Sequence, residues 1–194
     1  MGSDVQTDGP RTARVRREDE ERMMDEVEVL TDRARLTAVA AWDGEHPGLK
    51  RRLDEVAART AARLGFPLSL VSLVLDSAVV FAGSHGLVGW IAEVGALPVE
   101  WSFCSTTVVT DAPYVVGDAT VDPVHRDNPV VTEEGARSYA GVPLRTPDGR
   151  VVGAHCVIGV DPHEFTAEEI AELESAAAEL VTIFEEHRTG SAAA

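Results

Sequence analysis

The spacing of hydrophobic positions changes along the chain, and each spacing predicts a different kind of element. From residue 17 to residue 42, apolar side chains recur at alternating steps of four and three, as in a coiled coil or helix bundle. We expect one helix over 17–42, packed either on its own domain or on a second copy. Residues 49–64 form a second amphipathic pattern, and Gly65 follows as a helix stop.

Two hairpins are predicted from the apolar runs. Residues 68–75 are almost continuously apolar, as in a strand buried on both faces, and residues 78–84 return as its partner. Residues 139–144 and 151–160 form a second pair, joined by a turn of the sequence Thr-Pro-Asp-Gly at 146–149. These four segments supply most of the expected sheet.

The segments between and after the hairpins are less regular. Residues 87–99 are interpreted as an irregular region, and Ser102 is placed to cap a short helix over 103–109. Residues 114–116 form a short strand, and 121–131 form a loop with at most one helical turn. Long loops inside a compact domain are usually functional.

The order of elements predicts an α+β fold. A capping box, Thr-Ala-Glu-Glu at 166–169, opens a final helix with apolar residues again spaced by three and four. We expect one central antiparallel sheet, with a helical layer on one face and a loop-built pocket on the other. Residues 1–16 are expected to be a disordered arm.

Net charge narrows the classes of partner. The chain carries 17 basic and 33 acidic residues, and its formal charge is −16. Such a surface repels nucleic-acid phosphates and anionic lipids, so we expect no nucleic acid and no membrane among its partners. No apolar run approaches the roughly 20 residues that span a bilayer, and the first 22 residues lack a signal-peptide core. We therefore expect a cytoplasmic protein.

Four short motifs stand in a recognisable order. They read Trp-Ser-Phe-Cys at 101–104, Asp-Asn-Pro at 127–129, Tyr-Ala-Gly-Val-Pro-Leu at 139–144 and Pro-Asp-Gly at 147–149. Together they resemble a bacterial subgroup of the GAF domain, a small-molecule-sensing module of signalling proteins. The resemblance covers about residues 49–187.

The resemblance implies a GAF-like sheet, a ligand held between the sheet and the loops around the third and fourth strands, and regulation of an output domain. It also departs from the family pattern, because Thr106 stands where relatives often have His, and His155 stands where they usually have Leu. The second strand likewise has Val80-Phe81-Ala82 in place of Trp-Phe-Lys. The family's ligand contacts carry over to Trp101, Phe103, Cys104, Asp118, Asn128, Tyr139 and Gly141.

His155 is a further candidate ligand residue. Strand alternation places His155 on one face with Gly153 and Val157, and Cys156 on the other face. A histidine in an apolar strand more often satisfies both ring nitrogens with local partners, so a structural role is the leading alternative. Asp118 has a similar alternative, which is to cap a turn.

The two cysteines, Cys104 and Cys156, have two interpretations. They are either buried small hydrophobes or a redox pair brought together by the fold. No nucleophile elbow, phosphate-binding glycine loop or metal spacing is present, and His85, His125 and His163 are scattered. We therefore expect no enzyme, unless the cysteines form a small reductase.

The sequence thus predicts a cytoplasmic GAF-type sensory domain over 49–187 with a flexible tail over 188–194. It would bind a small-molecule ligand, form a homodimer through its N- and C-terminal helices, and signal to a separate output protein. The ligand and any cofactor are not identified. The alternatives are a thiol-redox sensor or small reductase using Cys104 and Cys156, and a dimeric interaction scaffold with a collapsed pocket.

Overall fold

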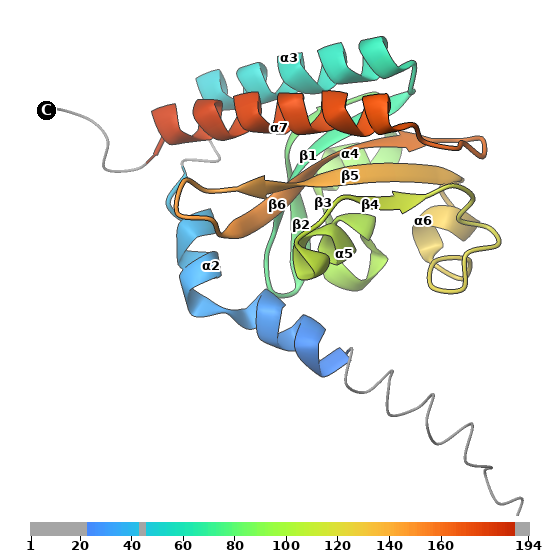
Figure 1. Ribbon diagram of the computed structural model, residues 1–194, viewed down its shortest axis with the longest axis horizontal. Coiled ribbons are helices and arrows are strands. Elements are labelled where there is room, and N and C mark those ends of the chain that lie inside the picture. The colour runs from blue at the N-terminus through green and yellow to red at the C-terminus, as the bar shows by residue number, and fades with distance from the viewer. Residues whose placement is uncertain (1–22, 43–45, 189–194) are drawn as a thin grey trace, which may run out of the picture.

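A six-stranded antiparallel sheet forms the centre of the protein (Figure 1). The computed structural model describes residues 23–42 and 46–188. The strands follow the order β3-β2-β1-β6-β5-β4, so β1 and β6 are central. The strand bounds are β1 Leu68–Val74, β2 Ala78–His85, β3 Ala96–Pro98, β4 Tyr114–Val116, β5 Ser138–Arg145 and β6 Val151–Gly159. Both predicted hairpins are confirmed, and the sheet is antiparallel throughout.

Two long helices cover one face of the sheet (Figure 1). They are α3, Pro47–Leu64, and α7, Ala167–Glu186, and their apolar sides form one core with β1, β5 and β6. The Thr166 capping box begins α7, and Gly65 ends α3 in the left-handed conformation, as predicted. We call this side the helix face.

The opposite side, called the cap face here, contains more regular structure than predicted. It carries α4, Gly89–Val94, the short 3-10 helix η1, Val99–Trp101, α5, Phe103–Thr110, and α6, Pro129–Thr132. The interpretation of residues 87–99 as irregular was wrong. Gly95 ends α4 with a φ of 68°, and the chain then pairs with β2 as strand β3. Ser102 caps α5 as expected.

The predicted single helix over 17–42 is interrupted. Residues 23–31 are helical, the helix breaks at Asp32, and α2 begins again at Arg33 and runs to Val39. The Asp32 carboxylate accepts a hydrogen bond from the backbone N–H of Arg35, at 2.7 Å, and so starts a new helix. The cap at Asp32 therefore divides the single helix that the apolar repeat predicted into two.

Arg35 then fixes the N-terminal segment to the sheet. Its buried guanidinium donates to the backbone oxygens of Val29, Leu30 and Val74, at 3.0, 2.6 and 2.5 Å. Burial lowers the pKa of Arg35, although nearby carboxylates oppose this effect. Because one side chain satisfies carbonyls from two segments, the N-terminal helix is tied to the end of β1.

The end of the first described stretch meets the C-terminal end of α7. The Trp42 ring stacks on Phe184 of α7 with centroids 4.3 Å apart, and Trp42 forms an isolated antiparallel bridge with Arg188. The predicted arm over 1–16 and residues 189–194 of the predicted tail lie outside the described residues. Among the described helices, none is long and apolar enough to cross a membrane.

Candidate functional site

Tyr139 stands at the centre of a buried polar cluster on the cap face. It projects from β5, is fully buried, and its hydroxyl lies 2.9 Å from Thr107 Oγ1 of α5. The same hydroxyl donates to Cys104 Sγ at 3.5 Å. Burial raises the pKa of Tyr139 well above its ordinary value, so the group stays a phenol and a hydrogen-bond donor.

Aromatic rings support this cluster from the side. Phe103 stacks on Tyr139 with centroids 5.1 Å apart, and the ring of His125 lies 4.3 Å from Phe103. His125 Nε2 is hydrogen bonded to Tyr114 Oη at 2.8 Å, and burial lowers the His125 pKa. Sequence reasoning left His125 as a scattered loop histidine, because no local pattern indicates a ring contact 22 residues away.

The structure brings Cys104 and Cys156 together. Cys104 lies in the first turn of α5 and Cys156 in β6, both are buried, and their sulfurs are 3.8 Å apart. Hydrogen bonding from Cys156, and then from Ser72, Tyr139 and Ser102, lowers the pKa of Cys104 against the effect of burial. The hydrogen bond with Cys104, and then burial, raise the pKa of Cys156. Cys104 is therefore the thiol that ionises first.

Four of the predicted ligand residues line a small inner recess. Its volume is about 40 Å³, enough for roughly one water molecule, so the side chains nearly fill it. The stacked rings of Phe103 and Tyr139 form part of its wall. The predicted residues that line it are Trp101, Phe103, Cys104 and Tyr139.

A larger cavity of about 220 Å³ lies next to the recess, and the two spaces share six wall residues. Side chains from five parts of the chain contribute: the two central strands, β2, the segment 86–97, and the region of α6 and Ala136. Its named lining residues are Pro67, Leu68, Leu70, Phe81, Gly86, Leu87, Val88, Ile91, Leu97, Val130, Glu134, Ala136, Ile158 and Val160.

Sequence reasoning missed most of this cavity. Residues 87–99 were interpreted as irregular, although the apolar side chains Leu87, Ile91 and Leu97 carried a signal for burial. Phe81 was noticed only as a departure from the family pattern, and it lines both spaces.

Asp118 and Asn128 have partners within the protein. Asp118 makes a two-pronged ion pair with Arg137, at 2.9 and 3.1 Å, and also accepts hydrogen bonds from Thr120. Arg137, and then Thr120, lower the Asp118 pKa to about 2. Asn128 caps α6 and donates to the Trp101 carbonyl at 3.1 Å. These contacts shape the loops of the cap and leave both side chains out of the lining of the two cavities.

His155 lies on the helix face, away from the Tyr139 cluster. Its Nδ1 donates to the Leu70 carbonyl at 3.0 Å, and its Nε2 lies 3.0 Å from Thr60 Oγ1 of α3. Desolvation by burial lowers the pKa of His155 to about 4, so the ring is neutral at pH 7. The structural alternative accounts for both nitrogens, and the structure places His155 outside the cap-face cavities.

Gly141 is on the cap face beside Tyr139, two residues along β5. A Cβ at this position would lie 2.0 Å from Tyr139 Oη. The missing side chain at Gly141 therefore makes room for the Tyr139 ring against the sheet.

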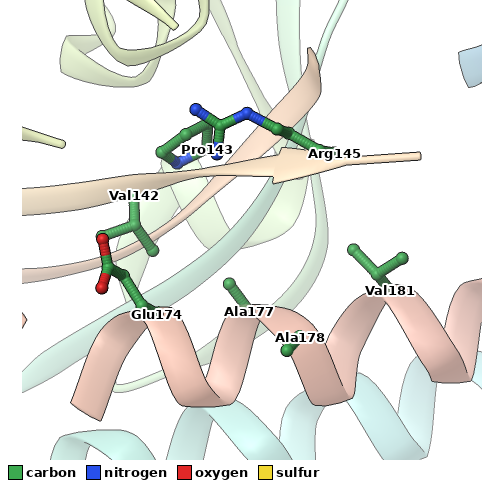
Figure 2. A pocket seen from close by; sticks show the side chains of 7 residues that line it. All are labelled: Val142, Pro143, Arg145, Glu174, Ala177, Ala178 and Val181. Carbon is green, nitrogen blue, oxygen red and sulfur yellow. The ribbon is translucent and has the colours of Figure 1, made fainter. Parts of the chain in front are cut away.

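A separate groove of about 400 Å³ lies on the helix face between β5 and α7 (Figure 2). Val142 points from β5 toward the helix, while Ala177 and Ala178 leave the space open on the α7 side. Glu174 of α7 lines the groove, whereas the Arg145 side chain lies on the other side of β5, where it pairs with Asp111. Within residues 23–42 and 46–188, no group of three His, Cys, Asp or Glu side chains is arranged to hold a metal ion.

Comparison with known proteins gives a family match. The model of the GAF domain matches residues 48–183. A cyclic di-GMP phosphodiesterase of Pseudomonas aeruginosa is 34% identical over 129 residues, which cover 66% of this chain. The match spans about a fifth of that relative, 21% of its length.

Solved structures show the same fold at low sequence identity. The GAF domain from a phosphoenolpyruvate-protein phosphotransferase of Coxiella burnetii superposes with a TM-score of 0.61 at 21% identity, covering 84% of this chain and 94% of that one. A free methionine-R-sulfoxide reductase from Neisseria meningitidis, solved with its substrate, has a TM-score of 0.58 at 22% identity, covering 78% and 84%. The fold therefore occurs both in a domain of a phosphotransferase and in a methionine sulfoxide reductase, and it does not by itself indicate the function.

Proposed function

The chain belongs to the GAF domain family, and from this premise we propose that it is a sensory domain that binds a small molecule between the sheet and the cap of α4, α5 and α6. The observation that carries the proposal is the cavity of about 220 Å³ beside the Tyr139 recess. Largely apolar pockets with a few polar groups are the usual binding sites of small molecules. The family resemblance also implies a ligand on this face, which supports the proposal.

A route from the cavity to the helices supports the sensory role. The Leu70 side chain lines the cavity, and its carbonyl oxygen is bonded to His155, which in turn contacts Thr60 of α3. A ligand that moves β1 at Leu70 would therefore disturb the packing of α3 on the sheet. In this proposal the terminal helices pass the change to a second copy and to a separate output protein.

Native mass spectrometry of the purified full chain tests the proposal. We expect a mass excess under gentle conditions that is lost on denaturation, because a retained ligand is released when the cavity disappears. The variant Ala136→Phe places a ring in the cavity and should abolish the excess. Ala178→Phe makes the same change in the groove of the helix face and should retain it.

Absence of a bound ligand would contradict the proposal. A bare polypeptide mass for the wild type, together with no thermal shift from neutral, cationic or anionic metabolites, would contradict ligand sensing. It would favour the interaction scaffold, whose pocket is filled by its own side chains.

A second candidate function, a thiol-redox sensor, is favoured by the 3.8 Å separation of the Cys104 and Cys156 sulfurs. In this candidate a small peroxide enters through the recess, which Cys104 lines. The Cys104 thiolate attacks hydrogen peroxide and breaks its O–O bond, which forms a sulfenic acid and releases hydroxide; the hydroxide takes up the proton lost from Cys104 and becomes water. Cys156 then displaces the second water, so two thiols and one peroxide give one disulfide and two waters.

Hydrogen peroxide treatment distinguishes this candidate from ligand sensing. If Cys104 and Cys156 form a redox pair, the intact mass should fall by two hydrogens in the wild type, because the sulfurs need only approach from 3.8 Å to about 2 Å. Cys104→Ser should leave the mass unchanged, whereas Cys156→Ser should gain one oxygen at Cys104. An unchanged wild-type mass under conditions that oxidise free glutathione would refute the redox function.

A further inference from the structure

The chemistry of the cavity wall narrows the ligand class. Thirteen of the fourteen lining residues are apolar or glycine, and Glu134 is the single ionisable side chain among those described as lining it. No lining lysine, arginine or histidine is available there to neutralise an anion. An anionic group in the apolar part of the cavity would be desolvated without a paired cation, and at the Glu134 end it would be repelled by a like charge.

Glu134 also has a defined position at the cap. Its Oε1 accepts a hydrogen bond from Trp90 Nε1 at 2.7 Å, and this contact joins α4 to the segment that follows α6. The second carboxylate oxygen accepts no hydrogen bond from the described residues, so it is available to a donor or a cation. Glu134 is exposed, which puts this polar end of the cavity next to solvent.

Size limits the ligand as well. An engineered apolar cavity of about 150 Å³ in another protein holds benzene, so a cavity of about 220 Å³ suits a molecule on the order of ten non-hydrogen atoms. Drug-sized ligands occupy pockets from about 300 Å³ upward. Nucleotides exceed this size and also carry phosphate, and none of the residues that line the cavity is a cation that could pair with it.

Resting on the proposed small-molecule function, we propose that this cavity binds a small hydrophobic molecule without negative charge, whose cationic or hydrogen-bond-donating group lies at Glu134. The apolar part, a short alkyl chain or a single ring, fills the space between Leu70, Ile91 and Val130. The chain's overall charge of −16 favours the same choice, because it attracts cations and repels anions.

Three probes with one alkyl chain and different head groups test this class: 1-octanol, octylamine in its protonated form, and octanoate. Affinities are measured by calorimetry with the full chain, below the concentrations at which the probes aggregate. We expect octylammonium to bind at least about tenfold tighter than octanoate, with octanol between them. Glu134→Gln should reduce this ratio to less than about threefold and leave octanol within about twofold.

Two cavity variants separate binding in the cavity from adsorption to the acidic surface. Ala136→Phe should abolish binding of all three probes, and Ala178→Phe should leave it unchanged. Leu87→Phe is a second blocking variant in a partly exposed loop position, and it serves if Ala136→Phe does not fold. Surface adsorption of octylammonium would persist in both blocking variants and would overturn the proposal.

Other outcomes overturn the ligand class in different ways. Octanoate binding as tightly as octylammonium would refute the role of Glu134. A different result is that no octyl probe binds, while native mass spectrometry finds a polar or anionic ligand that Ala136→Phe removes. That result would support the sensory function and refute the proposed class of hydrophobic ligand. If neither probe nor co-purified ligand binds the wild type, both proposals fall.

Discussion

Replacing Gly141 with alanine is expected to destabilise the protein by about 2–5 kcal/mol. The new Cβ would lie 2.0 Å from Tyr139 Oη and 2.5 Å from Cζ. Tyr139 has no room to move, because its ring stacks on Phe103 and it is fully buried. Displacing it would also leave Thr107 Oγ1 buried without its 2.9 Å partner. Urea unfolding with an unchanged m-value would measure the loss.

Two comparisons isolate the cause of this loss. Gly135→Ala also adds a methyl group, but nothing lies within 4 Å and only its positive φ of 79° is unfavourable, by about 1–2 kcal/mol. Gly141→Ala should be the more damaging change, and it should be less damaging in a Tyr139→Phe background, where the nearest oxygen is gone. Equal losses at Gly135 and Gly141, or additivity with Tyr139→Phe, would refute the steric explanation.

Acidification from pH 6.5 to pH 4 is expected to remove about 3 kcal/mol of stability through His155 alone. Its pKa falls from 6.5 to about 4 on folding, chiefly because burial disfavours the charged ring. The unfolded state therefore binds more protons in this interval, so stability is fully present above pH 6.5 and declines as the pH falls toward 4. Protonation also places a second N–H against Thr60, whose hydroxyl must then turn to accept.

His155→Gln is the test for this assignment. The amide group can donate to the Leu70 carbonyl and accept from Thr60, and it does not titrate. Its unfolding free energy should therefore vary less between pH 4 and pH 6.5 than that of the wild type, by about 3 kcal/mol. His85→Gln, at the exposed end of β2, should follow the wild-type curve. Parallel curves for the wild type and His155→Gln would show that other groups cause the acid sensitivity.

Elements signalled by neighbouring residues were predictable. The capping box at Thr166, the cap at Ser102 and the stop at Gly65 depend on hydrogen bonds within one helical turn, and all three are present. Strand alternation likewise put His155 and Cys156 on opposite faces, as observed. Prediction failed at Asp32, where a local cap interrupts a longer repeat, and over 87–99, where pairing with a distant strand creates β3.

The candidate site was predictable only in part. The family motifs identified Trp101, Phe103, Cys104 and Tyr139, which do gather on the cap face. They did not indicate that these side chains nearly fill the recess, or that a larger cavity lies beside it. That cavity depends on where α4 and α6 pack over the sheet, and packing volume is a property of all the surrounding side chains together.

By itself, the sequence determined the order of the long helices and hairpin strands, the α+β class, the caps of α5 and α7 and the family, because each depends on periodicity or short motifs. Tertiary structure alone decided which distant groups meet: the sulfurs of Cys104 and Cys156, and His155 against Thr60. These partners are separated by 52 and 95 residues, and their contact depends on strand register and helix placement. Burial then sets their chemistry, because desolvation and close packing act only once the chain has folded.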